Sequence, residues 1–364
     1  MRGGIFTKGE TTLKYTTFSM IAALGITTAG LASAQEQITV NIGSSHPEAN
    51  IWVYAMKNTF QPEVNRILAE AGNEYQVDWV EAYAGTLYKF TDTREAVMDG
   101  IVDVGMVGTV WEGANMPLQN VTYFTPFATS DHKMIIEIFD DLSQNLPELA
   151  NSWSENGMVH LSSLITDSYD IYATFPVTAM ADLQNRKLNA PGTSANWLQG
   201  TGATPVDGAL TTYYTNIQTG VTEGTLSFAS GILPTRVYEV APELTRVGIG
   251  SMYFGGIAAN EDFFNGLPEP IQVAFREAAK ATSIAHGDYV TELSERAMVE
   301  MQAAGLTVHD LPDAEKTAWV EGLPDIVAPW LEQTGEAGNV VLKAYFDALR
   351  ERGATPLRNW NEGR

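Results

Sequence analysis

The sequence predicts an α/β fold in two lobes, followed by a long helical part. Strand-like alternation and helical periodicity follow one another from residue 38 to 107. The pattern restarts near Met158, and helical patterns dominate from Pro268 onward. Strands alternating with helices indicate β/α units and largely parallel sheets. No long flexible linker separates the two halves, so we expect several chain crossings between the lobes, with a cleft and a hinge there.

The expected elements of the first lobe rest on two periodicities. Residues 38–43 alternate apolar and polar side chains, as a half-buried strand does, whereas 51–71 repeat apolar residues at helical spacing. In order, the expected elements are a strand at 38–43, a helix at 51–71 interrupted by Pro62, a strand at 75–82, a helix at 93–100 and a short apolar strand at 102–107.

The second half repeats this pattern and then turns helical. Its expected strands are 159–161 and 169–173, followed by short β/α units to about residue 227 and a further pair of strands at 246–249 and 253–259. The expected helices of the C-terminal part are 268–304, 314–322 and 326–352.

The charge and the absence of cysteine exclude several kinds of function. The 364 residues include 44 Asp and Glu against 21 Lys and Arg, a net charge of −23 that is spread along the chain. A chain this acidic is repelled by phosphate backbones, so we expect no nucleic-acid partner. The absence of cysteine excludes disulfides, thiol nucleophiles and Cys-bound metals.

The first 34 residues have the three parts of a secretory signal peptide. Arg2, Lys8 and Lys14 give a basic start, residues 18–31 are apolar and small, and Ala-Ser-Ala ends at Ala34. The apolar run is shorter than the ~20 residues that a membrane span needs. We therefore expect cleavage after Ala34 and a soluble periplasmic protein with 18 basic and 43 acidic residues.

No sequence motif points to catalysis, so we expect no enzyme, no cofactor and no metal. The chain has no H-x-x-x-H pair, no Gly-x-Ser-x-Gly, no P-loop and no dinucleotide-binding glycine pattern. Asp140 with Asp141, and Asp167 with Asp170, are acid pairs that a solvated helix face and a pocket edge explain equally well. An extracytoplasmic hydrolase remains an alternative without a positive motif.

Three segments together resemble one family. They are Gly85-Thr86-Leu87 with the run from Thr93 to Gly105 (TREAVMDGIVDVG), Asp182 to Gly192 (DLQNRKLNAPG), and Tyr214 to Gly224 (YTNIQTGVTEG). Asn260 and the run from Phe263 to Pro268 (FFNGLP) fit as well. In this order, behind a signal peptide, they resemble the C4-dicarboxylate-binding type of solute-binding protein from tripartite ATP-independent periplasmic (TRAP) transporters.

The resemblance implies the architecture and the partners. It implies a two-lobed periplasmic binding protein fold, with mixed, mostly parallel sheets, helices on both faces and a long C-terminal helical part. Lobe I would comprise 35–158 and about 249–290, lobe II 159–248 and about 291–335, and residues 336–364 a helical extension. The protein would be a monomer that binds a small solute and delivers it to the small and large TRAP membrane subunits.

One position departs from the family pattern and bears on the ligand. The arginine that normally pairs with a ligand carboxylate is replaced by Asn189, and the family asparagine further on by Ser227. Burying an anion without a paired charge costs several kcal/mol. We therefore expect a polyol or sugar, a zwitterion or a cation rather than an arginine-clamped dicarboxylate, unless Arg186 or Arg236 supplies a relocated clamp for an organic acid or sulfonate.

The candidate ligand-binding residues are aromatic or polar side chains near expected strand ends. Aromatic faces near an acid suit a cation, and the same groups suit a sugar or polyol. Trp197 and Tyr213 belong to this aromatic group. The predicted binding residues are His46, Tyr88, Trp111, Asp167, Tyr169, Asn189, Tyr214 and Ser227.

Overall fold

The computed structural model describes residues 35–72 and 74–364. The predicted signal peptide therefore lies outside the described residues. Residues 35–364 form one compact unit that contains two mixed β-sheets. Of the strand pairings among the described residues, five are parallel and four antiparallel.

The first sheet has the strand order β2-β1-β3-β10-β4. Its strands are β1 (Glu36–Gly43), β2 (Tyr75–Ala82), β3 (Val104–Gly108), β4 (Met158–Ile165) and β10 (Tyr253–Asn260). In β1, Val40 and Ile42 are fully buried, whereas Thr39 and Asn41 are more accessible, as the alternation predicts. β10 enters between β3 and β4 and is antiparallel to both.

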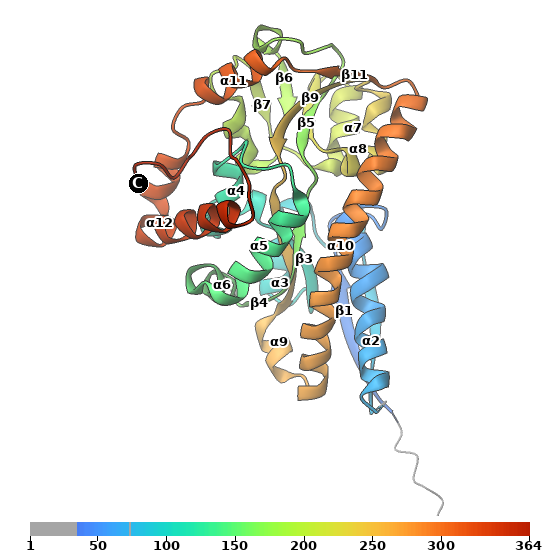
Figure 1. The fold of residues 1–364 in the computed structure, drawn as a ribbon. Coiled ribbons are helices and arrows are strands. Elements are labelled where there is room, and N and C mark those ends of the chain that lie inside the picture. Colours follow the sequence, from blue (N-terminus) through green and yellow to red (C-terminus); the bar gives the residue numbers. More distant parts are fainter. Residues whose placement is uncertain (1–34, 73) are drawn as a thin grey trace, which may run out of the picture. The chain divides into compact units, whose positions relative to one another are not determined.

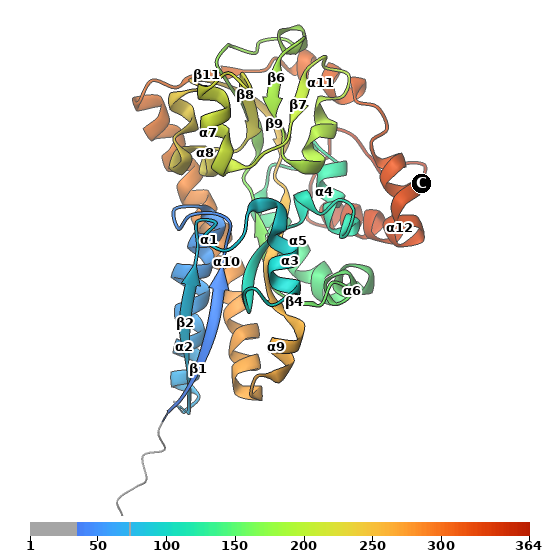
Figure 2. The same ribbon diagram turned by 180° about the vertical axis from the view of Figure 1, so that it is seen from behind.

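The second sheet has the order β11-β9-β5-β8-β6-β7. Most of its strands are labelled in Figure 1, and β8 is labelled in Figure 2. Its strands are β5 (Tyr169–Ala173), β6 (Lys187–Asn189), β7 (Thr204–Val206), β8 (Gly224–Ser227), β9 (Glu243–Gly250) and β11 (Thr307–Asp310). The two strands expected as a pair near residue 250 both form, but β9 lies in the second sheet and β10 in the first. The chain crosses between the sheets at Ser251–Met252, because the positive φ of Gly250 turns it there.

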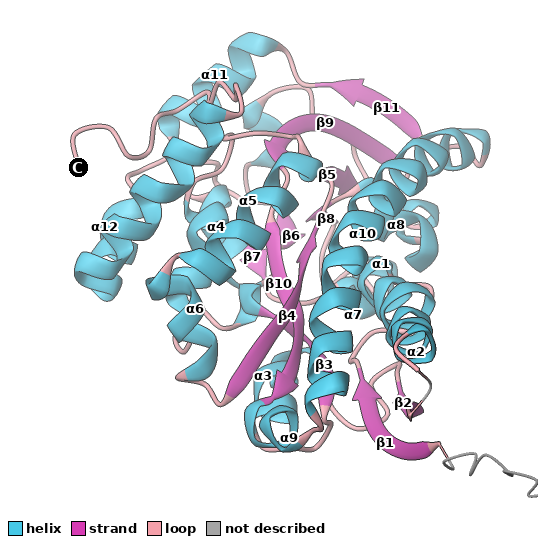
Figure 3. Ribbon diagram, turned by 60° about the horizontal axis from the view of Figure 1, so that its bottom comes forward, coloured by secondary structure: helices cyan, strands magenta, loops and turns pink. Residues whose placement is uncertain are grey.

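Helices cover the sheets, and one of them contacts both halves (Figures 1 and 2). The helices are α1 (Ile51–Ala55), α2 (Gln61–Glu70), α3 (Thr93–Met98), α4 (Val121–Phe124), α5 (His132–Asn145), α6 (Pro147–Ser154), α7 (Leu210–Gln218), α8 (Ala229–Thr235), α9 (Glu261–Gly266), α10 (Glu269–Ala303), α11 (Asp313–Gly322) and α12 (Val327–Glu351). The long helix α10 contacts α2 and β4 on the side of the first sheet and α8 on the side of the second. Figure 3 shows α10 running beside β3 and β4 toward α8.

The C-terminal part is less helical than the sequence predicts. α12 has a kink at Gly335 and ends at Glu351, and residues 352–364 are not helical. The tail packs back instead of extending the helix, because Trp360 is buried and its Nε1 donates a 2.8 Å hydrogen bond to the carbonyl of Pro126. Among the residues that the structure describes, no helix combines the length and the apolar character of a membrane span.

Candidate functional site

The ends of strands from both sheets meet around one pocket, here called the aromatic pocket. The first-sheet side contributes residues that follow β1 and β3 together with the start of β10, and the second-sheet side contributes the start of β5 and the residues after β6 and β8. Carboxyl ends of parallel strands are where open α/β sheets bind ligands. The lining residues are His46, Trp52, Val110, Trp111, Tyr169, Pro191, Ala209, Leu210, Tyr213, Ser227, Phe228 and Phe254.

The local sequence places the rings of the first-sheet side. Asn50 caps α1 by accepting a 2.9 Å hydrogen bond from the backbone N–H of Trp52, which fixes the start of the helix that carries this ring. The Trp52 indole stacks on Phe254, with ring centroids 3.4 Å apart. Phe254 in turn meets Trp111 edge-on, at 5.5 Å and an interplanar angle of 83°.

The two sides of the aromatic pocket touch directly. The Trp111 Nε1 donates a 3.3 Å hydrogen bond to the carbonyl of Gly208. Gly192, in the turn after β6, has φ +47°, and a Cβ built on it would lie 2.1 Å from the carbonyl oxygen of Val110. This approach is possible only because glycine has no side chain.

Two polar atoms of the aromatic pocket have no hydrogen-bond partner among the described residues: His46 Nε2 and Ser227 Oγ. Both side chains are almost fully buried. The other ring nitrogen of His46, Nδ1, lies 2.9 Å from Ser45 Oγ. Burial lowers the pKa of His46 from 6.5 to about 3, so the imidazole is neutral near pH 7. Buried polar atoms are normally hydrogen-bonded, so these two are available to a ligand.

Four of the eight predicted residues line the aromatic pocket: His46, Trp111, Tyr169 and Ser227. The other four lie elsewhere. Tyr88 is buried in a separate apolar cluster, where Gly43 and Gly105 leave room for its ring. Tyr214 is half-buried on α7, whereas its neighbour Tyr213 is buried and lines the pocket. Successive residues on a helix point about 100° apart, so only one of two adjacent tyrosines can face in.

Asp167 lies at the crossing from β4 to β5 and does not line the aromatic pocket. Its carboxylate accepts hydrogen bonds from the Ser230 hydroxyl and backbone N–H. Burial raises its pKa to about 6, although these bonds lower it. Asp170 behaves similarly: it accepts from the N–H groups of Val247 and Gly248, and burial raises its pKa to about 6. Both acids accept hydrogen bonds from backbone N–H groups, and neither lines the aromatic pocket.

Asn189 does not reach the aromatic pocket. It is fully buried, and its amide Nδ2 donates to Thr222 Oγ1 at 2.8 Å and to the Gly224 carbonyl at 3.1 Å. Its Oδ1 accepts from Asn216 Nδ2 at 2.9 Å. The expectation that this amide points into the cleft is wrong for this structure, because its hydrogen bonds link β6 to α7 and to β8.

Asn189→Ala is therefore expected to lower stability and to leave solute binding nearly unchanged. The free energy of unfolding should fall by about 1–3 kcal/mol, since the Asn216 amide and the Gly224 carbonyl lose a buried partner. Urea unfolding and calorimetric titration measure the two effects separately. Ser227→Ala is the comparison variant, and it should weaken binding while changing stability little, because the Ser227 hydroxyl lines the pocket and has no partner among the described residues. A loss of affinity in Asn189→Ala larger than that in Ser227→Ala would contradict this placement.

Neither arginine proposed as a relocated clamp lines the aromatic pocket. The Arg186 guanidinium lies 4.0 Å from the ring centroid of Phe175, and its Nη1 is 2.6 Å from the Glu223 carboxylate. Arg236 is mostly exposed and pairs with Glu239. Among the described lining residues, the aromatic pocket has no charged side chain.

Several rings of the aromatic pocket could not be predicted from the sequence. Trp52, Phe228 and Phe254 belong to no recognisable motif, and Tyr213 lines the pocket where the sequence predicts Tyr214. One signal was available for Phe228, because it directly follows the predicted residue Ser227 at a strand end.

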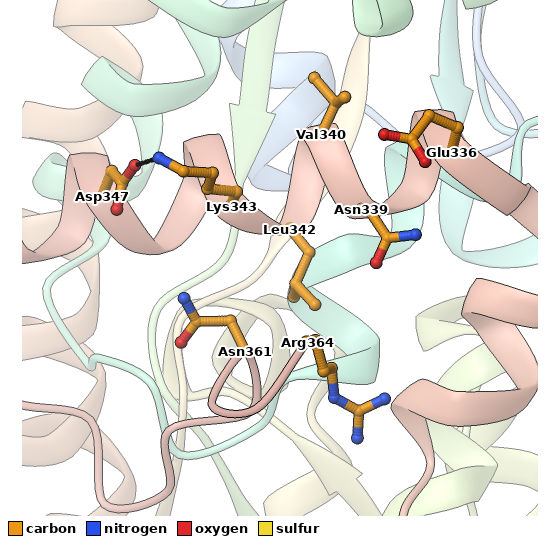
Figure 4. A pocket seen from close by; sticks show the side chains of 8 residues that line it. All are labelled: Glu336, Asn339, Val340, Leu342, Lys343, Asp347, Asn361 and Arg364. Carbon is orange, nitrogen blue, oxygen red and sulfur yellow. Dashed lines mark hydrogen bonds and ion pairs between the residues drawn. The ribbon is translucent and has the colours of Figure 1, made fainter.

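A second hollow lies between α12 and the C-terminal tail (Figure 4). Its charged side chains are mostly paired: Lys343 with Asp347, and Arg364 with Asp325. It holds none of the predicted binding residues. The lining residues are Glu336, Asn339, Val340, Leu342, Lys343, Asp347, Asn361 and Arg364.

The aromatic pocket lies between two mixed sheets and contains two polar atoms, His46 Nε2 and Ser227 Oγ, that have no partner among the described residues. This arrangement is that of an α/β protein that binds a ligand between two sheets. Residues 43–334 match the profile of the family described as bacterial extracellular solute-binding protein, family 7. The chain belongs to this family, the solute-binding proteins of TRAP transporters, which bind small molecules and work with membrane subunits.

Known relatives and solved structures show a shared fold with different solutes. The ectoine-binding periplasmic protein TeaA of Halomonas elongata is 26% identical over 311 residues, which cover 82% of this chain and 90% of TeaA. The C4-dicarboxylate-binding periplasmic protein DctP of Rhodobacter capsulatus is 25% identical, over 76% of this chain and 83% of its own. The structure of DctP7, a Bordetella pertussis solute receptor binding pyroglutamic acid, superimposes with a TM-score of 0.75 at 20% identity, covering 85% of this chain and 99% of its own.

Proposed function

We propose that the chain captures a small polar solute without net negative charge in the aromatic pocket and delivers it to the TRAP membrane subunits. The observation that carries this proposal is the pocket lining, which combines six aromatic rings of Trp, Tyr and Phe, a neutral imidazole and a free hydroxyl without any charged side chain. An anion buried there would have no positive partner, which costs several kcal/mol. The free volume of the pocket in this structure is only about 10 Å³, about that of one water molecule, so the walls must part to admit even a small solute.

In this proposal the residues of the aromatic pocket have distinct roles. His46 Nε2 and Ser227 Oγ hydrogen-bond the polar end of the solute, whereas Trp111 and Tyr169 cover its faces from opposite sheets. The relative TeaA is an ectoine-binding protein, which supports ectoine, a zwitterion, as one such ligand. Tyr88, Asp167, Asn189 and Tyr214 support the fold around the pocket.

The remaining features of the proposal follow from the predicted export and the two sheets. The signal peptide is cleaved after Ala34, and the mature chain is a periplasmic monomer without catalytic activity. The two sheets are the cores of two lobes that close on the solute. Because β4 pairs with β10 in the first sheet, the predicted boundary at 158 moves to about 165: lobe I comprises 35–165 with about 251–290, and lobe II comprises 166–250 with about 291–335. Closure is a shift of population toward a state in which the ligand contacts both lobes.

A thermal-shift screen of the exported chain tests the proposed function. The panel holds polyols, sugars, ectoine, quaternary amines, sulfonates, pyroglutamate and succinate. A ligand at 100 times its Kd stabilises the native state by about 2.7 kcal/mol, so we expect a non-anionic member to raise the melting temperature by several degrees. Ser227→Ala should reduce that shift, and Tyr214→Ala, which changes a ring outside the pocket, should not. A shift with succinate alone would contradict the proposal.

A further inference from the structure

The rings of the aromatic pocket are arranged around a rounded group rather than a flat one. Trp52 and Phe254 stack on each other at 3.4 Å, so no planar ligand fits between them. Most of the other neighbouring rings are inclined: Trp111 by 83° to Phe254, Phe228 by 53° to Trp52, and Tyr169 by 66° to Phe228. The exception is the His46 imidazole, which lies within 28° of parallel to Trp111, with ring centroids 6.2 Å apart. Inclined faces and edges enclose a compact group from several sides. The near-parallel pair of His46 and Trp111, 6.2 Å apart, leaves less than the ~7 Å that a ring held between two faces requires.

The electrostatics of the aromatic pocket favour a positive group. Its own side chains carry no charge at pH 7, and the acids nearest its second-sheet side act on its tyrosines. The pKa of Tyr169 is raised by burial and further by the negative charge of Asp167. The pKa of Tyr213 is raised well above 10 by burial, with contributions from Tyr169 and Asp207. Asp207 is held beside the pocket, because its Oδ1 accepts a 2.8 Å hydrogen bond from the N–H of Gly192.

Three arginines from the two halves of the molecule are paired with acids. Arg186 pairs with Glu223, and Arg236 pairs with Glu239. Near Trp111, Arg94 pairs with Glu95 and with the buried Glu112, whose carboxylate lies 3.0 Å from Arg94 Nε. The pocket lining itself has no positive charge, so the negative faces of its rings and the nearby Asp167 and Asp207 favour a positive group there.

We propose that the solute of the aromatic pocket is a small cation with a methylated ammonium at one end and a hydroxyl or carbonyl oxygen at the other. This inference rests on the proposed function and narrows its solute class. The methylated ammonium lies among Trp111, Phe228, Phe254 and Tyr169, where ring quadrupoles attract a cation that sheds water easily. His46 Nε2 and Ser227 Oγ bond the oxygen at the other end, which gives both buried atoms a partner.

Choline and its carbon isostere 3,3-dimethylbutan-1-ol form the decisive pair of probes. Both have the same shape and the same hydroxyl, and only choline carries a positive charge. Calorimetric titration of the exported chain at pH 7 is expected to show choline binding at least ten times more tightly than the isostere. Equal affinities would overturn the inference, because shape and apolar contact alone would then explain binding.

Ring variants test whether the aromatic faces cause the preference for choline. Trp111→Leu and Phe228→Leu keep an apolar side chain and remove a ring face, so the choline-to-isostere ratio should fall in both. Tyr214→Leu removes a ring outside the pocket and should leave the ratio unchanged. The ratio is the readout because loss of the Trp111 bond to Gly208 weakens both probes alike. An unchanged ratio in both pocket variants would also overturn the inference.

The outcomes separate this inference from the proposed function. If a polyol or sugar binds and choline gives no heat at millimolar concentration, the inference of a cationic solute is overturned. The proposed function, binding of a non-anionic solute, then still stands. Succinate binding more tightly than choline overturns both. If a ring variant does not fold, as circular dichroism would show, the comparison of the two probes on the wild-type chain still decides.

Discussion

Gly192→Ala is expected to weaken solute binding by roughly 100-fold or more while the chain still folds. An alanine Cβ at this position would lie 2.1 Å from the carbonyl oxygen and 2.8 Å from the carbonyl carbon of Val110. No side chain can move aside to relieve a clash with backbone, so the two sides of the aromatic pocket must separate by roughly 1 Å. A pocket that closes on its ligand loses contacts on every side when its walls part, and 100-fold corresponds to about 2.7 kcal/mol.

A matched control isolates the contact across the pocket from backbone strain. Gly220 also has positive φ (+74°), but nothing lies within 4 Å of a Cβ built on it. Both alanine variants should lose about 1–2 kcal/mol of stability through the left-handed conformation, and only Gly192→Ala should lose affinity. Calorimetric titration and urea unfolding of both variants give the comparison. Wild-type affinity in Gly192→Ala would mean that the two sheets do not have to approach this closely to hold the solute.

Most of the fold could be predicted from periodicity, and its exceptions have physical causes. β1 and β2 alternate clearly because one face of each is buried, and the helix at 269–303 is long enough for its pattern to be unambiguous. The partners of β9 and β10 could not be predicted, since two strands close in sequence usually pair with each other. Here Gly250, with φ +122°, turns the chain from one sheet into the other.

The candidate site could be predicted only in part, because position along the chain does not give orientation. His46 and Ser227 follow strands whose carboxyl ends face the pocket, and strand ends can be located from sequence. Whether Tyr213 or Tyr214 faces in depends on the rotation of α7, and whether Asn189 is free depends on Asn216 and Thr222, which lie far along the chain. Side chains that complete a pocket from distant elements, such as Trp52 and Phe254, leave no local pattern.

Acidification from pH 7 to pH 5 is expected to weaken binding of a cationic or neutral solute by about 30-fold, or about 2 kcal/mol, through His46. In the closed pocket burial lowers the pKa of this imidazole from 6.5 to about 3, whereas in an opened pocket solvent restores an ordinary pKa. The open form therefore takes up a proton as pH falls below about 6.5, and the closed form does not until about pH 3. Each proton bound to the open form opposes closure, so affinity declines across this window. Titration calorimetry at pH 7, 6 and 5 measures it.

The direction of the pH effect also reports the charge of the solute. A cation would be repelled by a protonated His46, which adds to the loss at low pH. An anion would instead pair with the imidazolium, raise its pKa and bind more tightly at pH 5 with uptake of a proton. His46→Gln keeps a neutral hydrogen-bonding side chain and should bind with little pH dependence. Unfolding must be measured in parallel, because other buried groups also titrate. Burial lowers the pKa of His160 and His286 to about 4, which favours unfolding at low pH. Burial raises the pKa of Asp167 and Asp170 to about 6, which opposes unfolding at low pH. Tighter binding at pH 5 in a folded wild-type chain, lost in His46→Gln, would show that the solute is an anion held by this histidine.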